Sequence, residues 1–303
     1  MPVSLENVLV IGISSRALFD LETEEAIYQQ QGLPGYRRHH LANENTELKP
    51  GAGFALVRAL LNLNALTPER RLVEVVIMSR NSSETSLRIF NSIQHYNLDI
   101  TRAALTGGAA LAPYLKAFNI SLFLSLHEQD VIAAADSGVA AAQLYQKPDQ
   151  VPEPTIIEPG QIRIAFDGDA VIFSDESERI YQAQGIEAFE RHERDNANNP
   201  LAAGPFAPVL KALAFIQANF SSGTDQSPIR TALVTARASP AHERVIRTLR
   251  AWNVQIDETF FMGGVEKSAV LAAFQPHMFF DDQHGHCQRA APLVQTGRVP
   301  GPV

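Results

Sequence analysis

The sequence predicts an α/β protein made of two tandem domains, each with a parallel sheet at its centre. Three observations support this prediction. The chain has 303 residues, 45% of them apolar, which is enough for two cores. Short apolar runs alternate with amphipathic stretches, a pattern typical of strands joined by helices in a parallel sheet. The two halves of the chain also resemble each other at a nearly fixed spacing.

This internal repeat is most regular near the start of each half. A shift of 153 positions aligns residues 14–65 with residues 167–218 without a gap, and a shift of 156 aligns later segments. One repeat of this length has the size of a whole domain and indicates duplication of a domain. The matched segments are IYQxQG at 27–32 and 180–185, Arg38-His39 and Arg191-His192, and Gly107-Gly108 and Gly263-Gly264.

The domain boundaries follow from the repeat and from proline. Residues 148–161 contain Pro148, Pro152, Pro154 and Pro159, which disfavour both helices and central strands. We therefore expect a first domain at 1–147, a proline-rich linker at 148–161 and a second domain at 162–303.

The elements of the second half are predicted from apolar spacing. Short continuous apolar runs indicate buried strands, and apolar residues three and four positions apart indicate helices. Because ligands bind beyond the carboxyl ends of parallel strands, the residues that follow each strand are candidates for a site. Strands are predicted at 162–166, 231–236 and 277–280, and helices from about Ser174 to 184, at 207–220 and at 240–252.

Polar residues follow these strands in a set that suits phosphoryl transfer. Converging carboxylates repel unless a cation joins them, and oxygen ligands favour Mg²⁺. One carboxylate can attack phosphorus, and a second, two residues later, can act as acid and base. A threonine and a lysine can hold the phosphoryl oxygens. The candidates are Asp167 as nucleophile, Asp169 as acid and base, Gly168, Thr235, Ala236 and Lys267 on phosphate, and Asp167, Asp169, Asp281 and Asp282 on the metal.

Each of these features has a simpler interpretation when it stands alone. An isolated DxD is often a turn or a helix cap, and Asp281-Asp282 could cap the next helix. The ordered set on one domain favours catalysis. Nearby His284, His286 and Cys287 would suit zinc, but the surrounding carboxylates suit magnesium better.

The ordered motifs resemble those of the haloacid dehalogenase (HAD) superfamily, and the wider sequence resembles its cytosolic 5'-nucleotidase type I family. The resemblance spans almost the whole chain. It implies two tandem HAD-like Rossmannoid domains and magnesium-dependent hydrolysis of nucleoside 5'-monophosphates through an aspartyl-phosphate intermediate. The segments that carry it are AFDGDAVIFSDESE, PIRTALVTAR, IDETFFMGG with Lys267, PHMFFDDQ, SSRALFD and ANENTELKPG.

The first half lacks the catalytic acids. Ser14 and Arg16 align with Asp167 and Asp169, and among the aligned site positions only Ser79, opposite Thr235, keeps its chemistry. We therefore expect the first domain to be degenerate, the second to be catalytic, and the first to support it structurally. The alternative is that Ser14, Arg16 and Ser79 form an anion site for a nucleotide effector.

About 65 residues separate the first acid from TAR, which is more than one crossover helix needs. The sequence therefore predicts a small helical cap at about 180–203 that covers the site. Its candidates for contact with the base or ribose are Phe189, Arg191, His192 and Asn196.

Composition limits the partners. The net charge of −8 and the lack of a basic tract argue against a nucleic-acid surface, and no apolar run has the length of a membrane span. We expect a cytoplasmic protein, because no signal sequence is evident and Cys287 is the single cysteine. Homo-oligomerisation is left open. The alternative functions are hydrolysis of another small phosphate ester, such as a sugar phosphate, and a nucleotide-sensing scaffold with vestigial turnover.

Overall fold

The computed structural model describes residues 5, 7–146, 161–220 and 227–301. The chain divides into two compact units, residues 1–146 (unit 1) and residues 147–303 (unit 2). The predicted linker at 148–161 lies outside the described residues apart from Gln161.

Five parallel strands form the sheet of unit 1 in the order β3-β2-β1-β4-β5. In the middle strand, Ile11 is in register with Val75 on one side and Leu122 on the other. β1 and β2 are buried along their whole length, as expected for strands covered on both faces. The strands are β1 (Leu9–Ile13), β2 (Val73–Ser79), β3 (Arg102–Leu105), β4 (Leu122–Ser125) and β5 (Ala140–Leu144).

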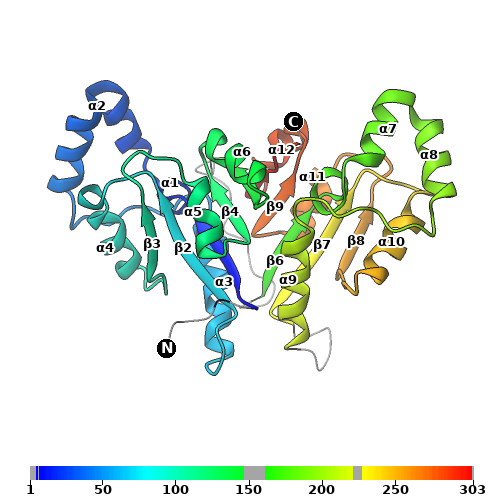
Figure 1. Cartoon of the computed structure of the whole chain (residues 1–303), viewed down its shortest axis with the longest axis horizontal. Helices are drawn as coiled ribbons and strands as arrows, with labels where there is room; N and C mark the ends of the chain where they lie inside the picture. Colours follow the sequence, from blue (N-terminus) through cyan, green and yellow to red (C-terminus); the bar gives the residue numbers. More distant parts are fainter. Residues whose placement is uncertain (1–4, 6, 147–160, 221–226, 302–303) are drawn as a thin grey trace. The chain divides into compact units, whose positions relative to one another are not determined.

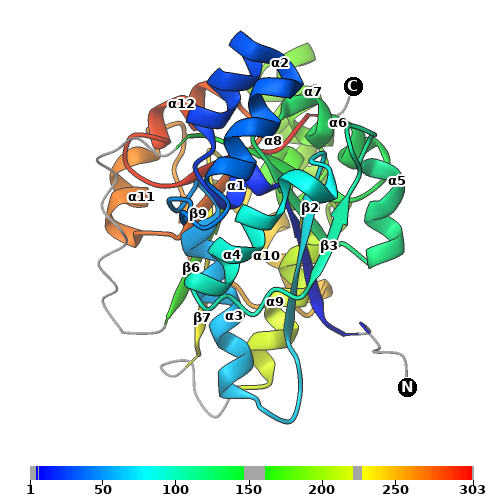
Figure 2. The same ribbon diagram turned by 90° about the vertical axis from the view of Figure 1, so that its left-hand side faces the viewer.

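Helices cover both faces of this sheet. In Figure 2, α3 and α4 lie on one side of the strands and α5 and α6 on the other. Leu115 and Val131 from the second pair pack on Val10, Val76 and Phe123 of the strands. The helices are α1 (Ser15–Leu18), α2 (Glu22–Ala42), α3 (Phe54–Leu66), η1 (Ser83–Thr85), α4 (Leu87–His95), α5 (Ala112–Leu115), η2 (Lys116–Phe118) and α6 (Glu128–Asp136).

Unit 2 repeats this arrangement with the strand order β8-β7-β6-β9-β10, again all parallel. In its middle strand, Ala165 is in register with Ala232 and Phe279. The strands are β6 (Ile162–Phe166), β7 (Ile229–Thr235), β8 (Glu258–Phe261), β9 (Met278–Asp281) and β10 (Thr296–Arg298).

The helices of unit 2 also pack on the apolar strands. Leu271, Phe274 and Ala290 cover one face of the sheet at Ala165 and Phe279. The parallel sheet between helices confirms the predicted α/β class and is consistent with a HAD-like Rossmannoid fold. The helices are η3 (Gly168–Ile172), α7 (Glu176–Gln184), α8 (Ile186–Asp195), α9 (Ala207–Ala218), α10 (His242–Ala251), α11 (Ser268–Phe274) and α12 (His284–Ala290).

Helices α7 and α8 form a hairpin that follows the first strand of unit 2 (Figure 1). The break between them is Gly185, with φ 80° and ψ −177°. In α2 of unit 1, Gly32 makes the same break with φ 63° and ψ −169°. Residues other than glycine rarely adopt a backbone conformation with such a positive φ. This explains why the repeated IYQxQG segment ends in glycine in both halves.

The turns that follow β1 and β6 differ by one residue. In unit 1, Phe19 N donates to Ser15 O, an α-helical bond, whereas in unit 2 Phe173 N donates to Gly168 O, a π-helical bond. Ala170 inside the π turn has φ 59°, a conformation that costs a residue with a Cβ about 1–2 kcal/mol. Such π turns are frequent at functional sites, and this one lies in the half that carries the acids.

Candidate active site

The candidate site is at the carboxyl ends of β6, β7 and β9. Asp167 follows β6 directly, and its backbone N–H donates to Phe280 O of β9 at 2.8 Å, so the two strand ends are held together. Beside it, a Cβ on Gly168 would lie 3.2 Å from Thr235 Oγ1 at the end of β7. The glycine thus lets the loop after β6 approach β7 closely.

Three carboxylates gather at this point. Ligand atoms of Asp167, Asp281 and Asp282 lie within 4.8 Å of one another, and these form the one such group among the described residues. Asp282 Oδ1 is buried and has no hydrogen-bond partner. Burial, followed by the charges of Asp167 and Asp281, raises the pKa of Asp282 to about 8. Burial likewise raises the pKa of Asp167 to about 6 against the opposing charge of Lys267.

Lys267 joins two of these carboxylates from the position just before α11. Its Nζ donates to Asp167 Oδ1 at 2.7 Å and to Asp281 Oδ2 at 2.8 Å. Burial alone would lower the pKa of Lys267, but the charges of Asp167 and Asp281 outweigh burial and raise it. Three ionised carboxylates and one ammonium leave two negative charges, which one divalent cation neutralises. The residues therefore fit Mg²⁺, with the orphaned oxygen of Asp282 as a ready ligand.

Asp169 stands apart from this group. Its carboxylate accepts two hydrogen bonds from Arg237, at 2.8 Å from Nε to Oδ2 and 2.6 Å from Nη2 to Oδ1. Arg237 also pairs with Glu193 of α8 through Nη1. The structure therefore does not bring the side chain of Asp169 into the three-carboxylate group, to which the sequence assigned it.

The predicted phosphate-binding segment is built from the loops after β7 and β8. Thr235 is buried, and its Oγ1 accepts from Arg237 N at 3.3 Å, while Ala236 is exposed beside it. Gly263 N and Gly264 N donate to Arg237 O and Ala236 O, both at 3.2 Å. The GG segment that precedes Lys267 thus fixes the backbone of the TAR motif.

The predicted substrate contacts all belong to α8 and its end. Phe189 lies next to the arginine, with the Arg237 guanidinium carbon 5.5 Å from its ring centre. His192 contacts Arg244 Nη1 at 3.2 Å, and Asn196 Nδ2 donates to His192 O at 2.9 Å. Arg191 is exposed. His192 and Asn196 are thus part of the packing around α8, and Phe189 reaches the Asp169–Arg237 pair.

The corresponding residues of unit 1 are engaged with one another. Arg16 donates to Glu22 Oε1 at 2.9 Å and lies 3.4 Å from Glu25. Ser14 Oγ caps α1 by accepting from Ala17 N at 3.2 Å. Ser79 Oγ lies 3.0 Å from Ser15 Oγ. An anion at this place would have to compete with two carboxylates for Arg16.

The residues that suggested zinc have other contacts. His286 Nδ1 lies 3.2 Å from Asp281 Oδ2, and Cys287 Sγ donates to the backbone O of Asp281 at 3.4 Å. Burial raises the pKa of the Cys287 thiol, which disfavours the thiolate that zinc requires. Burial alone would also raise the pKa of Asp281, but the His286 hydrogen bond and Lys267 hold it below its usual value.

Sequence reasoning did not assign a role to Arg237, Glu193 or Arg244. Arg237 was visible as the last residue of TAR, directly after Thr235 and Ala236, which the sequence predicted to bind phosphate. Glu193 and Arg244 carry no local signal, because their pairing joins α8 to α10 across 51 residues.

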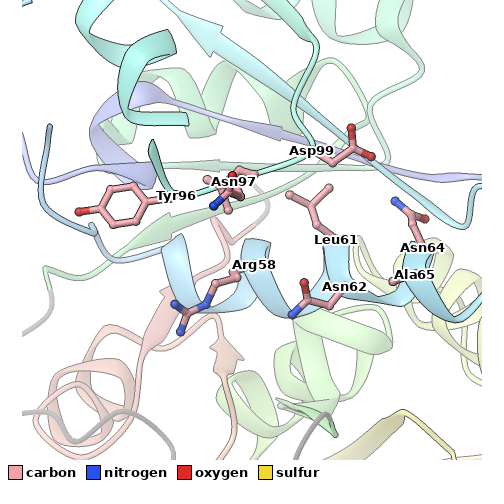
Figure 3. A pocket seen from close by; sticks show the side chains of 9 residues that line it. Arg58, Leu61, Asn62, Asn64, Ala65, Tyr96, Asn97 and Asp99 are labelled. Carbon is pink, nitrogen blue, oxygen red and sulfur yellow. The ribbon is translucent and has the colours of Figure 1, made fainter. Parts of the chain in front are cut away.

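A pocket of about 520 Å³ lies in unit 1 between α3 and the segment before β3 (Figure 3). It contains no residue that the sequence predicted for a site. Its polar side chains support the fold, since Asn64 binds the backbone of Leu72 and Val73 and Tyr96 donates to Leu48 O.

The sequence matches the family described as 5'-nucleotidase over residues 1–303. The chain belongs to the 5'-nucleotidase family. It is 39% identical over 300 residues to cytosolic 5'-nucleotidase 1B of Homo sapiens, an alignment that covers 96% of this chain and 48% of that relative. The chain thus spans about half the length of the relative. Membership of the 5'-nucleotidase family confirms the resemblance seen in the motifs. The match to the family covers both units.

The described part of the chain contains no helix with the length and apolar character needed to cross a bilayer.

Proposed function

We propose that this protein is a magnesium-dependent 5'-nucleotidase that hydrolyses nucleoside 5'-monophosphates to nucleoside and phosphate. The observation that carries the proposal is the group of Asp167, Asp281 and Asp282 around Lys267, which has the charge and the oxygen ligands for one divalent cation. Membership of the 5'-nucleotidase family and the name of the human relative support a nucleotide as the substrate.

The residues have separate tasks in this mechanism. Asp167 attacks the phosphorus, the bond from phosphorus to the 5'-oxygen breaks, and an aspartyl phosphate forms. Asp169, in its protonated form, gives a proton to the leaving 5'-oxygen, and as a carboxylate it then takes a proton from water. The water oxygen attacks the phosphorus, the bond from phosphorus to the Asp167 oxygen breaks, and phosphate and the free Asp167 carboxylate are released. Asp167, Asp281 and Asp282 would hold Mg²⁺, and the bound ion would supply positive charge that stabilises the phosphoryl oxygens.

Lys267 and Thr235 complete the phosphate site. The Lys267 ammonium already offsets the charge of Asp167 in the resting protein, and it is positioned to share its protons with phosphoryl oxygens as charge develops on them. Thr235 and the backbone of Gly168 and Ala236 line the same strand ends. Phe189 and Arg191 are proposed to meet the nucleoside, whereas His192 and Asn196 orient α8.

We also propose that the α7–α8 hairpin is the cap of the site and that the two units descend from one duplicated domain. The equivalent strand orders and the equivalent glycine breaks at Gly32 and Gly185 support the duplication. Unit 1 would then keep the fold without the acids. An effector role for Ser14, Arg16 and Ser79, a homo-oligomer and a cytoplasmic location stay predictions.

A phosphate-release screen tests this function. Nucleoside 5'-monophosphates and sugar phosphates are compared at equal concentration, with magnesium and with chelator. We expect nucleotides to be hydrolysed faster than sugar phosphates, and only with magnesium. Faster hydrolysis of a sugar phosphate would refute the assigned substrate, and full activity in chelator would remove the metal from the mechanism.

A further inference from the structure

Arg237 connects the acid Asp169 to the helical hairpin. Two nitrogens of its guanidinium bind both oxygens of Asp169, and the third binds Glu193 of α8. Only 2% of the Arg237 side chain is exposed. A bidentate pair of this kind fixes the plane of the carboxylate as well as its position, which a lysine could not do.

Glu193 is itself held on two further sides. Ser177 Oγ of α7 donates to Glu193 Oε1 at 2.7 Å, and Arg244 Nη1 of α10 donates to the same oxygen at 3.0 Å. Burial alone would raise the pKa of Glu193, but the charge of Arg237 and the hydrogen bond from Ser177 outweigh burial and lower it. Glu193 is therefore an ionised carboxylate that contacts with Ser177 and Arg244 hold in place, and it fixes the position of Arg237 in turn.

Unit 1 provides an internal comparison for this network. By the spacing of the repeat, Arg88 corresponds to Arg244, Asn81 to Arg237 and His40 to Glu193. Arg88 still binds a buried carboxylate, Glu24, at 2.6 Å. The arginine that holds the helices is thus present in both units.

The two units differ in the residues that join the helices to the strand end: Arg237 and Glu193 in unit 2 are replaced by Asn81 and His40 in unit 1. Asn81 accepts from Tyr36 Oη at 3.1 Å, and both ring nitrogens of buried His40 lack a hydrogen-bond partner. Burial lowers the pKa of His40 to about 4, so this ring is neutral near pH 7. Two neutral residues, Asn81 and His40, thus stand in unit 1 at the positions of the charged Arg237 and Glu193.

From this contrast we propose that Arg237 positions Asp169 for catalysis, with Glu193 as its anchor on α8. The inference rests on the proposed function, because it concerns the residue assigned as acid and base. The pair keeps the Asp169 carboxylate apart from Asp167, Asp281 and Asp282, and it makes the placement of Asp169 depend on the position of α8. A misplacement of about 1 Å at a reacting group can cost roughly 100-fold in rate.

The test compares substrates with poor and good leaving groups. Arg237→Gln should lower kcat for a nucleoside 5'-monophosphate by about 10- to 100-fold, with KM changed less than about 3-fold. The loss for an activated aryl phosphate should be below about 3-fold, since its leaving oxygen needs little protonation. Glu193→Gln should show the same pattern with a smaller loss. Arg247→Gln, which removes an exposed arginine paired with Glu243, is the control and should change neither substrate.

Two further measurements separate positioning from folding. Thermal unfolding of Arg237→Gln and Glu193→Gln gives the temperature range in which each variant is folded, because removing one partner of a buried ion pair strongly destabilises a protein, and turnover is compared within that range. In an Asp169→Asn background, Arg237→Gln should add no further loss, because both changes remove the same function. Equal losses for both substrates, or a full additional loss in that background, would overturn the inference.

A crystal structure of the Arg237→Gln protein tests the positioning of Asp169 separately from the proposed function. We expect the Asp169 carboxylate to leave the place it holds in the wild-type protein. An unmoved Asp169 would overturn the positioning role even if the protein is a nucleotidase. Failure of the wild-type protein to hydrolyse either phosphate would instead overturn the proposed function.

Discussion

Replacing Lys267 by methionine should destabilise unit 2 by about 3–5 kcal/mol when no divalent cation is bound. The Lys267 Nζ forms hydrogen bonds of 2.7 Å and 2.8 Å to Asp167 and Asp281, and 4% of the residue is exposed. Methionine preserves most of the volume but removes the charge, so three neighbouring carboxylates lose their cation. At about 2–4 °C per kcal/mol for a unit of this size, the melting temperature should fall by roughly 6–20 °C.

Trp252 gives a suitable signal for this experiment. It is the only tryptophan of the chain and packs on Phe173 in unit 2, with ring centres 5.6 Å apart. Urea unfolding followed by its fluorescence is compared for the wild type, Lys267→Met and the exposed control Arg247→Met. The control should lose less than about 1 kcal/mol. Magnesium should recover part of the loss in Lys267→Met. Equal stability of Lys267→Met and the control would refute the charge balance assigned to the site.

The other predictions concern pH, the general acid and unit 1. In chelator, stability should fall as pH rises from about 4 to 8, by at most about 1.4 kcal/mol per pH unit for each group, because Asp167 and Asp282 have raised pKa values and bind more protons folded than unfolded. Magnesium should flatten this profile, and a profile that rises over the same range would contradict the assignment. Asp169→Asn should slow a nucleotide more than an aryl phosphate, and equal losses would show that Asp169 is not the acid. Arg16→Ala should leave basal turnover unchanged, and a binding event in calorimetry with adenosine phosphates that disappears in this variant would establish an effector site.

Local sequence signals were sufficient for three of the five strands described in unit 2, β6, β7 and β9, and for most of the acidic site. The strand at 162–166 is observed with the predicted bounds, and those at 229–235 and 278–281 begin or end within two residues of the prediction. In a parallel sheet the carboxyl ends of neighbouring strands meet at one edge. Residues at the carboxyl ends of these strands, such as Asp167 directly after β6 and Asp281 as the last residue of β9, must therefore come together.

The contacts of the Asp169 side chain could not be predicted from the sequence. Its partner Arg237 is 68 residues away, and the pairing depends on how the loop after β7 turns toward α8. The spacing of DxD places Asp169 near Asp167 along the chain, but it does not state which way the side chain points. The prediction that Asp169 is a metal ligand rested on its place two residues after Asp167, at the end of a strand where other carboxylates converge, and it stays a prediction.

The gapless alignment of the two halves also concealed a difference. Phe19 pairs with Pro50 in unit 1, and Phe173 pairs with Ala203 in unit 2, so the spacing is 154 for the phenylalanines and 153 for their partners. The extra residue is taken up in the π turn that contains Ala170. A hydrogen-bond pattern of this kind leaves no mark in residue types, because both halves read as an apolar run after the first strand.

Phosphate release from a nucleoside 5'-monophosphate by wild-type and Asp167→Asn protein, both folded and both in magnesium, tests the central claim most directly. Asparagine keeps the shape of the side chain but cannot form the aspartyl phosphate. We predict that turnover falls by at least about 1,000-fold, as for other residues that act as a catalytic unit. Substantial release of phosphate by folded Asp167→Asn protein would contradict the assignment of Asp167 as the nucleophile.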